Sequence, residues 1–145
     1  MNWSDFLSLA SRLSSGGAEA EWRTGVSRAY YAVFHITRRL FTELNFVVPR
    51  ADRAHQYVVF RLSNCGDLRV EQAGRDLETL RRLRNRADYD DAPPVTRSQS
   101  GAAVQLAESI IQTLDVVKHE PARTLMRDTM VAYERDVLRD VTWHP

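Results

Sequence analysis

The sequence predicts an all-α fold: an antiparallel, up-and-down bundle of about five to six helices. Apolar residues recur at alternating spacings of three and four along the chain, which is the period of a half-buried helix. No stretch keeps the alternation of polar and apolar residues that a strand requires. The connections between the periodic segments are short, which favours antiparallel neighbouring helices. A length of 145 residues suits about one domain.

The first two helices are expected over residues 4–14 and 18–44. Ser4 is a candidate N-cap of the first, and Gly16-Gly17 ends it. The second contains a long seam of apolar side chains, and further apolar residues beside this seam indicate a central position in the bundle. The seam residues are Trp22, Val26, Ala29, Val33, Ile36 and Leu40.

The next two helices are expected over residues 52–63 and 69–89. Asp52 is the candidate cap of the third helix, whose predicted core residues are Tyr57, Phe60 and Leu62. Pro93-Pro94 follows the fourth helix and prevents its extension. Gly74 lies inside that helix at a cost of about 1 kcal/mol relative to alanine, which predicts close packing there. The seam residues of the fourth helix are Val70, Ala73, Leu77 and Leu80.

The last two helices are expected over residues 96–118 and 122–140, and Pro121 suits the first turn of the sixth. We expect residues 1–118 to form the bundle and residues 119–145 to form a helical extension packed on the same domain. The stripe of the sixth helix either completes the core or docks a partner. The fifth seam is Ala103, Ala107, Ile110, Leu114 and Val117, and the sixth stripe is Met126, Met130, Tyr133 and Val137.

Composition excludes several classes of protein. A hydrophobic fraction of 43% argues against disorder, and a net charge of +1 argues against nucleic-acid binding by bulk electrostatics. No apolar run has the roughly 18 residues of a membrane span, and the N-terminus lacks the pattern of a signal peptide. The single cysteine, Cys65, and the absence of metal-ligand or phosphate-loop motifs predict no metal and no cofactor. We therefore expect a cytoplasmic protein without a membrane partner.

An arginine interrupts the apolar seam of the fourth helix. The seam continues from Leu80 by four residues to Arg84 and then by three to Ala87, so a charge occupies a position where leucine is expected. Asp88 lies one turn further on the same face and is the predicted ion-pair partner. The arrangement is either an ion pair at the rim of the core or an arginine that faces a groove or subunit interface, ready for phosphate. Arg81 belongs to the same arginine-rich segment.

The second helix also carries a polar stripe, opposite its apolar seam. A solvated face would explain the stripe, but tyrosine and histidine are unusual residues for such a face. The alternative is a second wall of the same groove, with Arg28, Tyr31 and Arg38 as binding residues and His35 as a candidate acid or base. The whole stripe consists of Thr24, Arg28, Tyr31, His35, Arg38 and Thr42.

Two segments together resemble the HEPN family of small helical prokaryotic proteins. They are Ser-Arg-Ala-Tyr-Tyr-Ala-Val-Phe-His at residues 27–35 and Leu-Arg-Asn-Arg-Ala-Asp-Tyr-Asp at residues 83–90. The resemblance covers roughly residues 4–118. It implies a helical bundle that forms a homodimer through the second and fourth helices. It further implies an RNA-directed, metal-independent ribonuclease, in many relatives a toxin or defence component paired with a nucleotidyltransferase-like antitoxin.

The usual family motif joins an arginine and a polar residue to a histidine a few positions later. Arg84 and Asn85 match the first two positions, but Tyr89 stands where histidine is expected, so the chain resembles the subgroup whose motif ends in Ala-Asp-Tyr. Tyrosine, with a reference pKa of about 10 against about 6.5 for histidine, is a poor base at neutral pH.

The resemblance assigns roles to the motif residues. Arg84 contacts the scissile phosphate, Asn85 and Asp88 orient it, and Tyr89 or His35 moves the protons. The alternative is a non-catalytic HEPN module that binds a nucleotidyltransferase-like or other protein partner, or a nucleotide.

Overall fold

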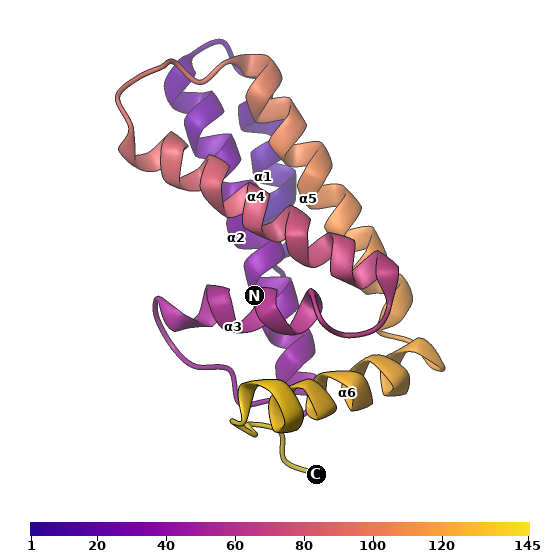
Figure 1. Cartoon of the computed structure of the whole chain (residues 1–145). Coiled ribbons are helices and arrows are strands. Elements are labelled where there is room, and N and C mark those ends of the chain that lie inside the picture. Colours follow the sequence, from indigo (N-terminus) through magenta and orange to yellow (C-terminus); the bar gives the residue numbers. More distant parts are fainter. The chain divides into compact units, whose positions relative to one another are not determined.

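The computed structural model describes all 145 residues and confirms the predicted fold class: six α-helices packed as a bundle, with no strand (Figure 1). An isolated β-bridge joins Phe46 to Trp143. None of the helices combines the length and apolar character needed to cross a membrane. The helices are α1 (Ser4–Ser14), α2 (Glu19–Glu43), α3 (Arg53–Leu62), α4 (Leu68–Tyr89), α5 (Arg97–Val117) and α6 (Ala122–Tyr133), followed by a π-helical turn, η1 (Glu134–Leu138).

The predicted ranges of the first five helices agree with the structure to within one residue at each end. Of the two predicted N-caps, Ser4 is wrong, whereas Asp52 occupies the N-cap position of α3 without capping it through its side chain. Ser4 is already helical, and its N–H donates to Oδ1 of Asn2 at 3.0 Å. Asp52 precedes α3 with a helical backbone conformation and makes no capping hydrogen bond. A capping side chain needs the extended backbone that neither residue adopts.

The predicted sixth helix is wrong in its last third. The α-helix ends at Tyr133, a π-helical turn follows, and Arg139 adopts a left-handed conformation with φ 53°. A π turn contains more residues than an α turn, so it changes which side chains face inward. Val137 is therefore 63% exposed instead of continuing the stripe, whereas Met126 and Met130 are buried, which agrees with the alternative that the stripe completes the core.

The chain divides into two compact units. The first unit comprises residues 1–36 and 76–111, and the second comprises residues 37–75 and 112–145. α1 belongs wholly to the first unit, α3 and α6 belong wholly to the second, and α2, α4 and α5 contribute residues to both. The predicted extension, residues 119–145, thus belongs to a unit that also contains α3.

The first unit has a core built from the predicted seams of α2, α4 and α5. A small-residue contact lies beside this core, where the hydroxyls of Ser14 and Ser100 are 2.7 Å apart. A Cβ placed on Gly25 would lie 2.7 Å from Oγ of Ser14 and 2.9 Å from Oγ of Ser100. The buried seam residues of this unit are Val26, Ala29, Val33, Leu77, Leu80, Ala103, Ala107 and Ile110.

The second unit confirms the close packing predicted at Gly74, where an added Cβ would lie 2.6 Å from Oγ of Ser63. The prediction that Phe60 belongs to the core is wrong, because this residue is 42% exposed. The buried face of α3 includes Tyr57, Val58 and Leu62, and Phe60, three residues after Tyr57, lies at the exposed edge of that face. Other buried side chains of this unit are Phe41, Val70, Leu114, Met126 and Met130.

Candidate functional site

The guanidinium of Arg84 lies among tyrosine rings in the first unit. Its central carbon is 5.2 Å from the ring centre of Tyr30, 5.1 Å from that of Tyr31 and 5.9 Å from that of Tyr89. The predicted ion pair is present: Nη1 of Arg84 is 3.8 Å from Oδ2 of Asp88, and the Arg84 side chain is 15% exposed. Arg84 therefore occupies a seam position with its charge near the protein surface and the rest of its side chain packed against neighbouring residues.

Asp88 connects two helices of this unit. Its Oδ2 accepts a hydrogen bond from Oγ of Ser27 at 3.2 Å, so one carboxylate serves both Arg84 of α4 and a serine of α2. Nε of Arg84, in contrast, is buried and has no hydrogen-bond partner. A buried donor without a partner is costly, because folding removed it from water without replacing the lost hydrogen bond. The ion pair therefore leaves part of the guanidinium unsatisfied.

A second arginine approaches the same tyrosine. The guanidinium carbon of Arg28 lies 5.1 Å from the ring centre of Phe6 and 5.4 Å from that of Tyr31. Its Nε is also buried without a hydrogen-bond partner. Two guanidinium groups thus share the ring of Tyr31, and we call Arg28, Tyr30, Tyr31 and Arg84 the arginine–tyrosine cluster. Three of the residues predicted from sequence, Arg28, Tyr31 and Arg84, meet here.

His35 lies beside this cluster. Its ring stacks on Trp3 with centroids 3.7 Å apart and planes inclined by 12°, and its centroid is 6.1 Å from that of Tyr31. Sequence analysis did not select Trp3, because the contact joins positions far apart in the chain and no spacing rule predicts it. Stacking covers a face of the imidazole ring, whereas the two nitrogens lie in the plane of the ring.

The remaining predicted site residues are placed less closely. Tyr89 is 75% exposed. Its one aromatic contact with the cluster is that of its ring with the guanidinium of Arg84. Asn85 is half-buried on the same turn of α4 as Arg84. Arg81 pairs with Glu78 at 3.6 Å on the surface of α4. Arg38 belongs to the second unit, so the predicted stripe of α2 is divided between the two units.

Burial changes the acid–base chemistry of Tyr30. Loss of solvent raises the pKa of Tyr30 to about 12, although the positive charge of Arg84 acts in the opposite direction. The phenol is therefore neutral at physiological pH, where it can donate a hydrogen bond but cannot act as a base.

Arg23 fixes the end of α4, a role that sequence analysis missed. Its Nη1 donates to the carbonyl oxygens of Ala87 at 2.9 Å and Asp90 at 2.6 Å, and its Nε pairs with Glu19 at 2.9 Å. Positive side chains are favoured at the carboxyl end of a helix. The spacing of Glu19 and Arg23 predicts their pairing, but not the contact with α4. Through this contact α2 holds the helical turn that carries Asp88 and Tyr89.

A second polar cluster, also missed, surrounds Glu134 in the second unit. Arg61 donates to Oε2 of Glu134 through Nε at 2.8 Å, and Nη2 also lies 2.8 Å from that oxygen. Oε1 accepts from the backbone N–H groups of Thr142 at 3.0 Å and Trp143 at 3.1 Å. The guanidinium carbon of Arg61 is 3.4 Å from the ring centre of Tyr57. Because Arg61 and Glu134 are distant in sequence, no local pattern reveals this pair.

The protein has no group of three or more histidine, cysteine, aspartate or glutamate side chains suited to holding a metal ion. The arginine–tyrosine cluster offers a different chemistry. Guanidinium groups bind phosphate and carboxylate through paired N–H donors, and aromatic faces accept planar groups or cations.

Comparison with protein families shows that the model described as HEPN domain matches residues 4–117. The matched range contains both helices that carry the arginine–tyrosine cluster and ends at the last residue of α5. No curated protein and no solved structure is similar enough to the chain to count as a match.

Proposed function

The chain belongs to the HEPN domain family, and from this membership we propose that it acts on RNA as a metal-independent endoribonuclease of the toxin or defence type. The observation that supports the proposal best is the environment of Arg84, whose guanidinium is packed against tyrosine rings yet retains an unpaired, buried Nε. A phosphate oxygen is a strong acceptor for the N–H groups of a guanidinium that the protein satisfies only in part.

In the proposed reaction, Arg84 binds the scissile phosphate and stabilises the charge of the pentavalent phosphorane. Asn85 and Asp88 orient the phosphate and the guanidinium, since Asp88 already holds Arg84 from one side at 3.8 Å. Arg28 supplies a second positive charge across the ring of Tyr31. The attacking group is the 2′-hydroxyl of the RNA, which must lose a proton as it attacks.

Two residues are candidates for moving that proton. Histidine has a reference pKa of about 6.5 and suits a base at neutral pH, which favours His35. Tyr89 is exposed, and its ring centre lies 5.9 Å from the guanidinium carbon of Arg84. Its hydroxyl suits donation of a hydrogen bond to the phosphate or of a proton to the leaving oxygen. Neither residue reproduces the histidine of the usual family motif. We therefore expect that the single substitution Tyr89→His strengthens the proposed activity.

We propose that the working form is a homodimer in which two copies bring their Arg84 side chains to one cleft. Light scattering at micromolar concentration tests this part of the proposal. A species near twice the monomer mass of 16.7 kDa is the expected result. A clean monomer contradicts the dimer. The proposed partner in the cell is a nucleotidyltransferase-like antitoxin.

The alternative is a non-catalytic HEPN module that binds a protein partner or a nucleotide. Tyrosine at the position of the motif histidine favours this alternative, and so does the 75% exposure of Tyr89. Exposed tyrosines are frequent in protein interfaces, where one large and rigid side chain contributes much of the binding energy.

Cleavage of total cellular RNA by purified protein in the presence of a chelator separates the two functions. We expect slow cleavage by the wild type, faster cleavage by Tyr89→His, and none by Arg84→Ala. Arg82→Ala is the matched control, because Arg82 lies on the same helix with a 76% exposed side chain that pairs only with Glu78. The ribonuclease proposal is contradicted if both the wild type and Tyr89→His leave the RNA intact and their induced expression is not toxic. That result favours the binding module.

A further inference from the structure

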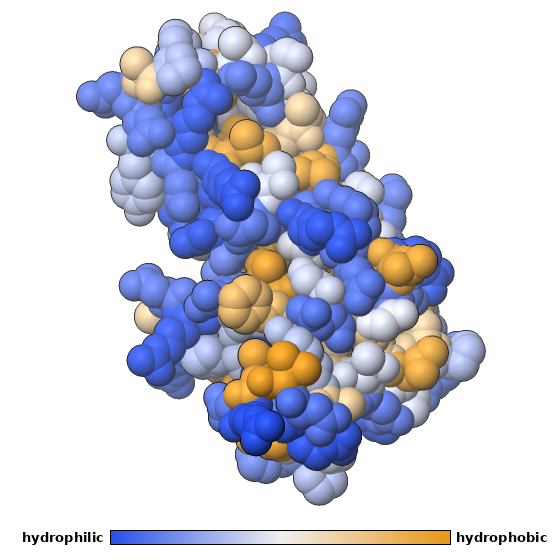
Figure 2. Space-filling view, in the orientation of Figure 1, coloured by the Kyte–Doolittle hydropathy of each residue, from blue (hydrophilic) through white to orange (hydrophobic).

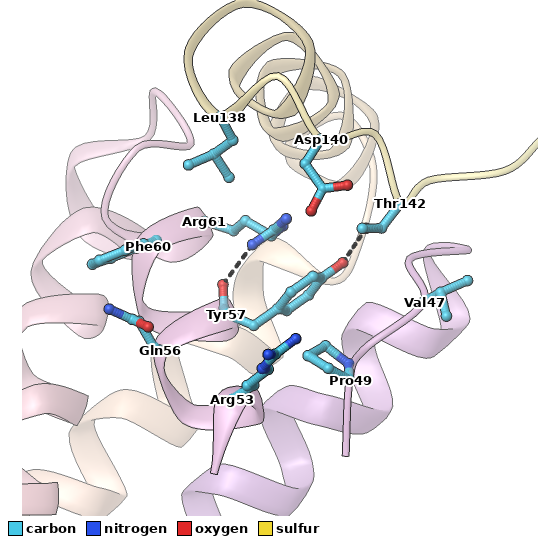
Figure 3. Close-up of a pocket in the computed structure, with 10 residues that line it drawn as sticks. All are labelled: Val47, Pro49, Arg53, Gln56, Tyr57, Phe60, Arg61, Leu138, Asp140 and Thr142. Atoms are coloured by element: carbon cyan, nitrogen blue, oxygen red, sulfur yellow. Dashed lines mark hydrogen bonds between the residues drawn. The ribbon is translucent and has the colours of Figure 1, made fainter. Parts of the chain in front are cut away.

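The second unit contains a pocket of about 400 Å³ that the proposed RNA chemistry does not use (Figure 3). This volume lies in the range of small-molecule sites. α3 forms one wall, and the segments around residues 47–49 and 138–142 form the others. The lining residues are Val47, Pro49, Arg53, Gln56, Tyr57, Phe60, Arg61, Leu138, Asp140 and Thr142.

The charges of the pocket favour a ligand that carries both signs. Figure 3 shows Arg53 and Asp140 on opposite sides of the Tyr57 ring. Neither of these two side chains makes a hydrogen bond or an ion pair within the protein, whereas Arg61 is neutralised by Glu134 at 2.8 Å. One unpaired cation and one unpaired anion remain. A ligand of net negative charge would gain from Arg53 but be repelled by Asp140.

The remaining walls are apolar. Val47 is 58% exposed and Phe60 is 42% exposed, and Leu138 and Pro49 complete the apolar lining. In Figure 2 apolar side chains reach the surface beside α3 and at the C-terminal end of α6, surrounded by hydrophilic ones. A ligand with an apolar group would bury these surfaces, at roughly 25 cal/mol for each Å² removed from water.

The floor of the pocket is already ordered. The hydroxyl of Tyr57 is hydrogen-bonded to Oγ1 of Thr142, and Nη1 of Arg61 donates to the carbonyl of Tyr57 at 3.1 Å (Figure 3). Thr142 is held in turn by Glu134, which accepts from its N–H at 3.0 Å. A floor that is formed before binding reduces the conformational entropy lost when a ligand is bound.

We propose that this pocket binds a free α-amino acid with an apolar side chain. The carboxylate of the ligand pairs with Arg53, its ammonium group pairs with Asp140, and its side chain packs against Phe60 and Leu138. The lining residues all belong to the second unit, and Arg84 belongs to the first, so this inference does not depend on the proposed action on RNA.

Isothermal titration calorimetry with L-leucine and L-phenylalanine tests the proposal. We expect both to bind and glycine to bind at least about tenfold more weakly, because it lacks the apolar group. N-acetyl-L-leucine and L-leucinamide each lack one charge and should also lose about tenfold or more. Arg53→Gln and Asp140→Asn should show comparable losses, with the fold intact because both residues are exposed and unpaired.

Two matched variants serve as controls for these losses. Arg50→Gln removes an exposed charge three residues from Arg53, and Asp136→Asn removes one four residues from Asp140, and neither residue lines the pocket. Both should bind leucine as the wild type does. Three results would each overturn the proposal. They are the absence of a heat of binding at millimolar amino acid, an affinity for leucine in the Arg53 and Asp140 variants equal to that of the wild type, and tighter binding of adenosine monophosphate than of leucine.

Discussion

Arg61 and Arg84 each lie over a tyrosine ring and face a carboxylate, yet the two regions differ in how fully the guanidinium is satisfied. In the second unit, all three nitrogens of Arg61 have partners, and its side chain and that of Glu134 are 4% and 0% exposed. In the first unit, Arg84 meets Asp88 at 3.8 Å and its Nε has no partner.

The difference indicates two uses of the same side chain. A fully satisfied buried pair fixes how segments of a fold meet, and removal of one member leaves the other charge buried and unpaired. The Arg61–Glu134 pair accordingly joins α3 to the segment after η1 through the N–H groups of Thr142 and Trp143. The guanidinium of Arg84, in contrast, is satisfied only in part by the protein. We therefore propose that Arg61 serves folding and Arg84 serves binding.

The largest expected effect is on stability, from Arg61→Ala. Loss of the guanidinium leaves the Glu134 carboxylate buried without its cation, which should lower the free energy of unfolding by about 3–5 kcal/mol. Urea denaturation followed by circular dichroism measures this change. Should the alanine variant fail to fold, Arg61→Lys provides the second measurement, with a smaller loss expected. A loss below about 1 kcal/mol in either folded variant would contradict a structural role for the pair.

The buried tyrosines of the two units should respond alike to alkaline pH. Burial raises the pKa of Tyr30 and of Tyr57 to about 12, whereas an unfolded tyrosine titrates near 10. Because the folded pKa is the higher one, this contribution to stability is complete below pH 10 and is lost as the pH rises from 10 through 12. Absorbance at 295 nm follows the titration in the wild type and in Tyr30→Phe and Tyr57→Phe. Titration of all five tyrosines near pH 10 in the folded protein would contradict this prediction.

Close packing at glycine should matter equally in the two units. A Cβ would lie 2.7 Å from Ser14 Oγ at Gly25 and 2.6 Å from Ser63 Oγ at Gly74, so each alanine substitution should destabilise by about 1–3 kcal/mol. Gly101→Ala is the control, because a Cβ there meets nothing within 4 Å and should stabilise α5 by up to about 1 kcal/mol. Thermal unfolding of the three variants distinguishes these signs. Equal effects in all three would contradict the packing argument.

The smallest expected effect on stability is that of Arg84→Ala. Asp88 keeps its hydrogen bond from Ser27 and its side chain is 29% exposed, so loss of this ion pair should change the free energy of unfolding by less than about 1 kcal/mol. The same urea titration measures it. A loss as large as that expected for Arg61→Ala would remove the contrast between the two arginines.

Periodicity predicted most of the fold because helices are local structures. The seam of α2 and the ion pair of Arg84 with Asp88 both follow from spacings of three and four residues. The stacking of Trp3 on His35 and the pairing of Arg61 with Glu134 join distant positions, so neither spacing nor propensity reveals them. The π turn at Glu134 is likewise a product of tertiary contacts, since that residue accepts hydrogen bonds from Thr142 and Trp143.

The affinity for single-stranded RNA tests the proposed role of Arg84 most directly. It is measured by fluorescence anisotropy at low salt for the purified wild type, Arg84→Ala and Arg84→Lys. Arg84→Ala should weaken binding by roughly 10–100-fold, the effect of one charged hydrogen-bonding group. Lysine should restore only part of the loss, because it lacks the planar fork. Folded Arg84 variants that bind RNA as tightly as the wild type, or a wild type that binds no RNA, would contradict the account.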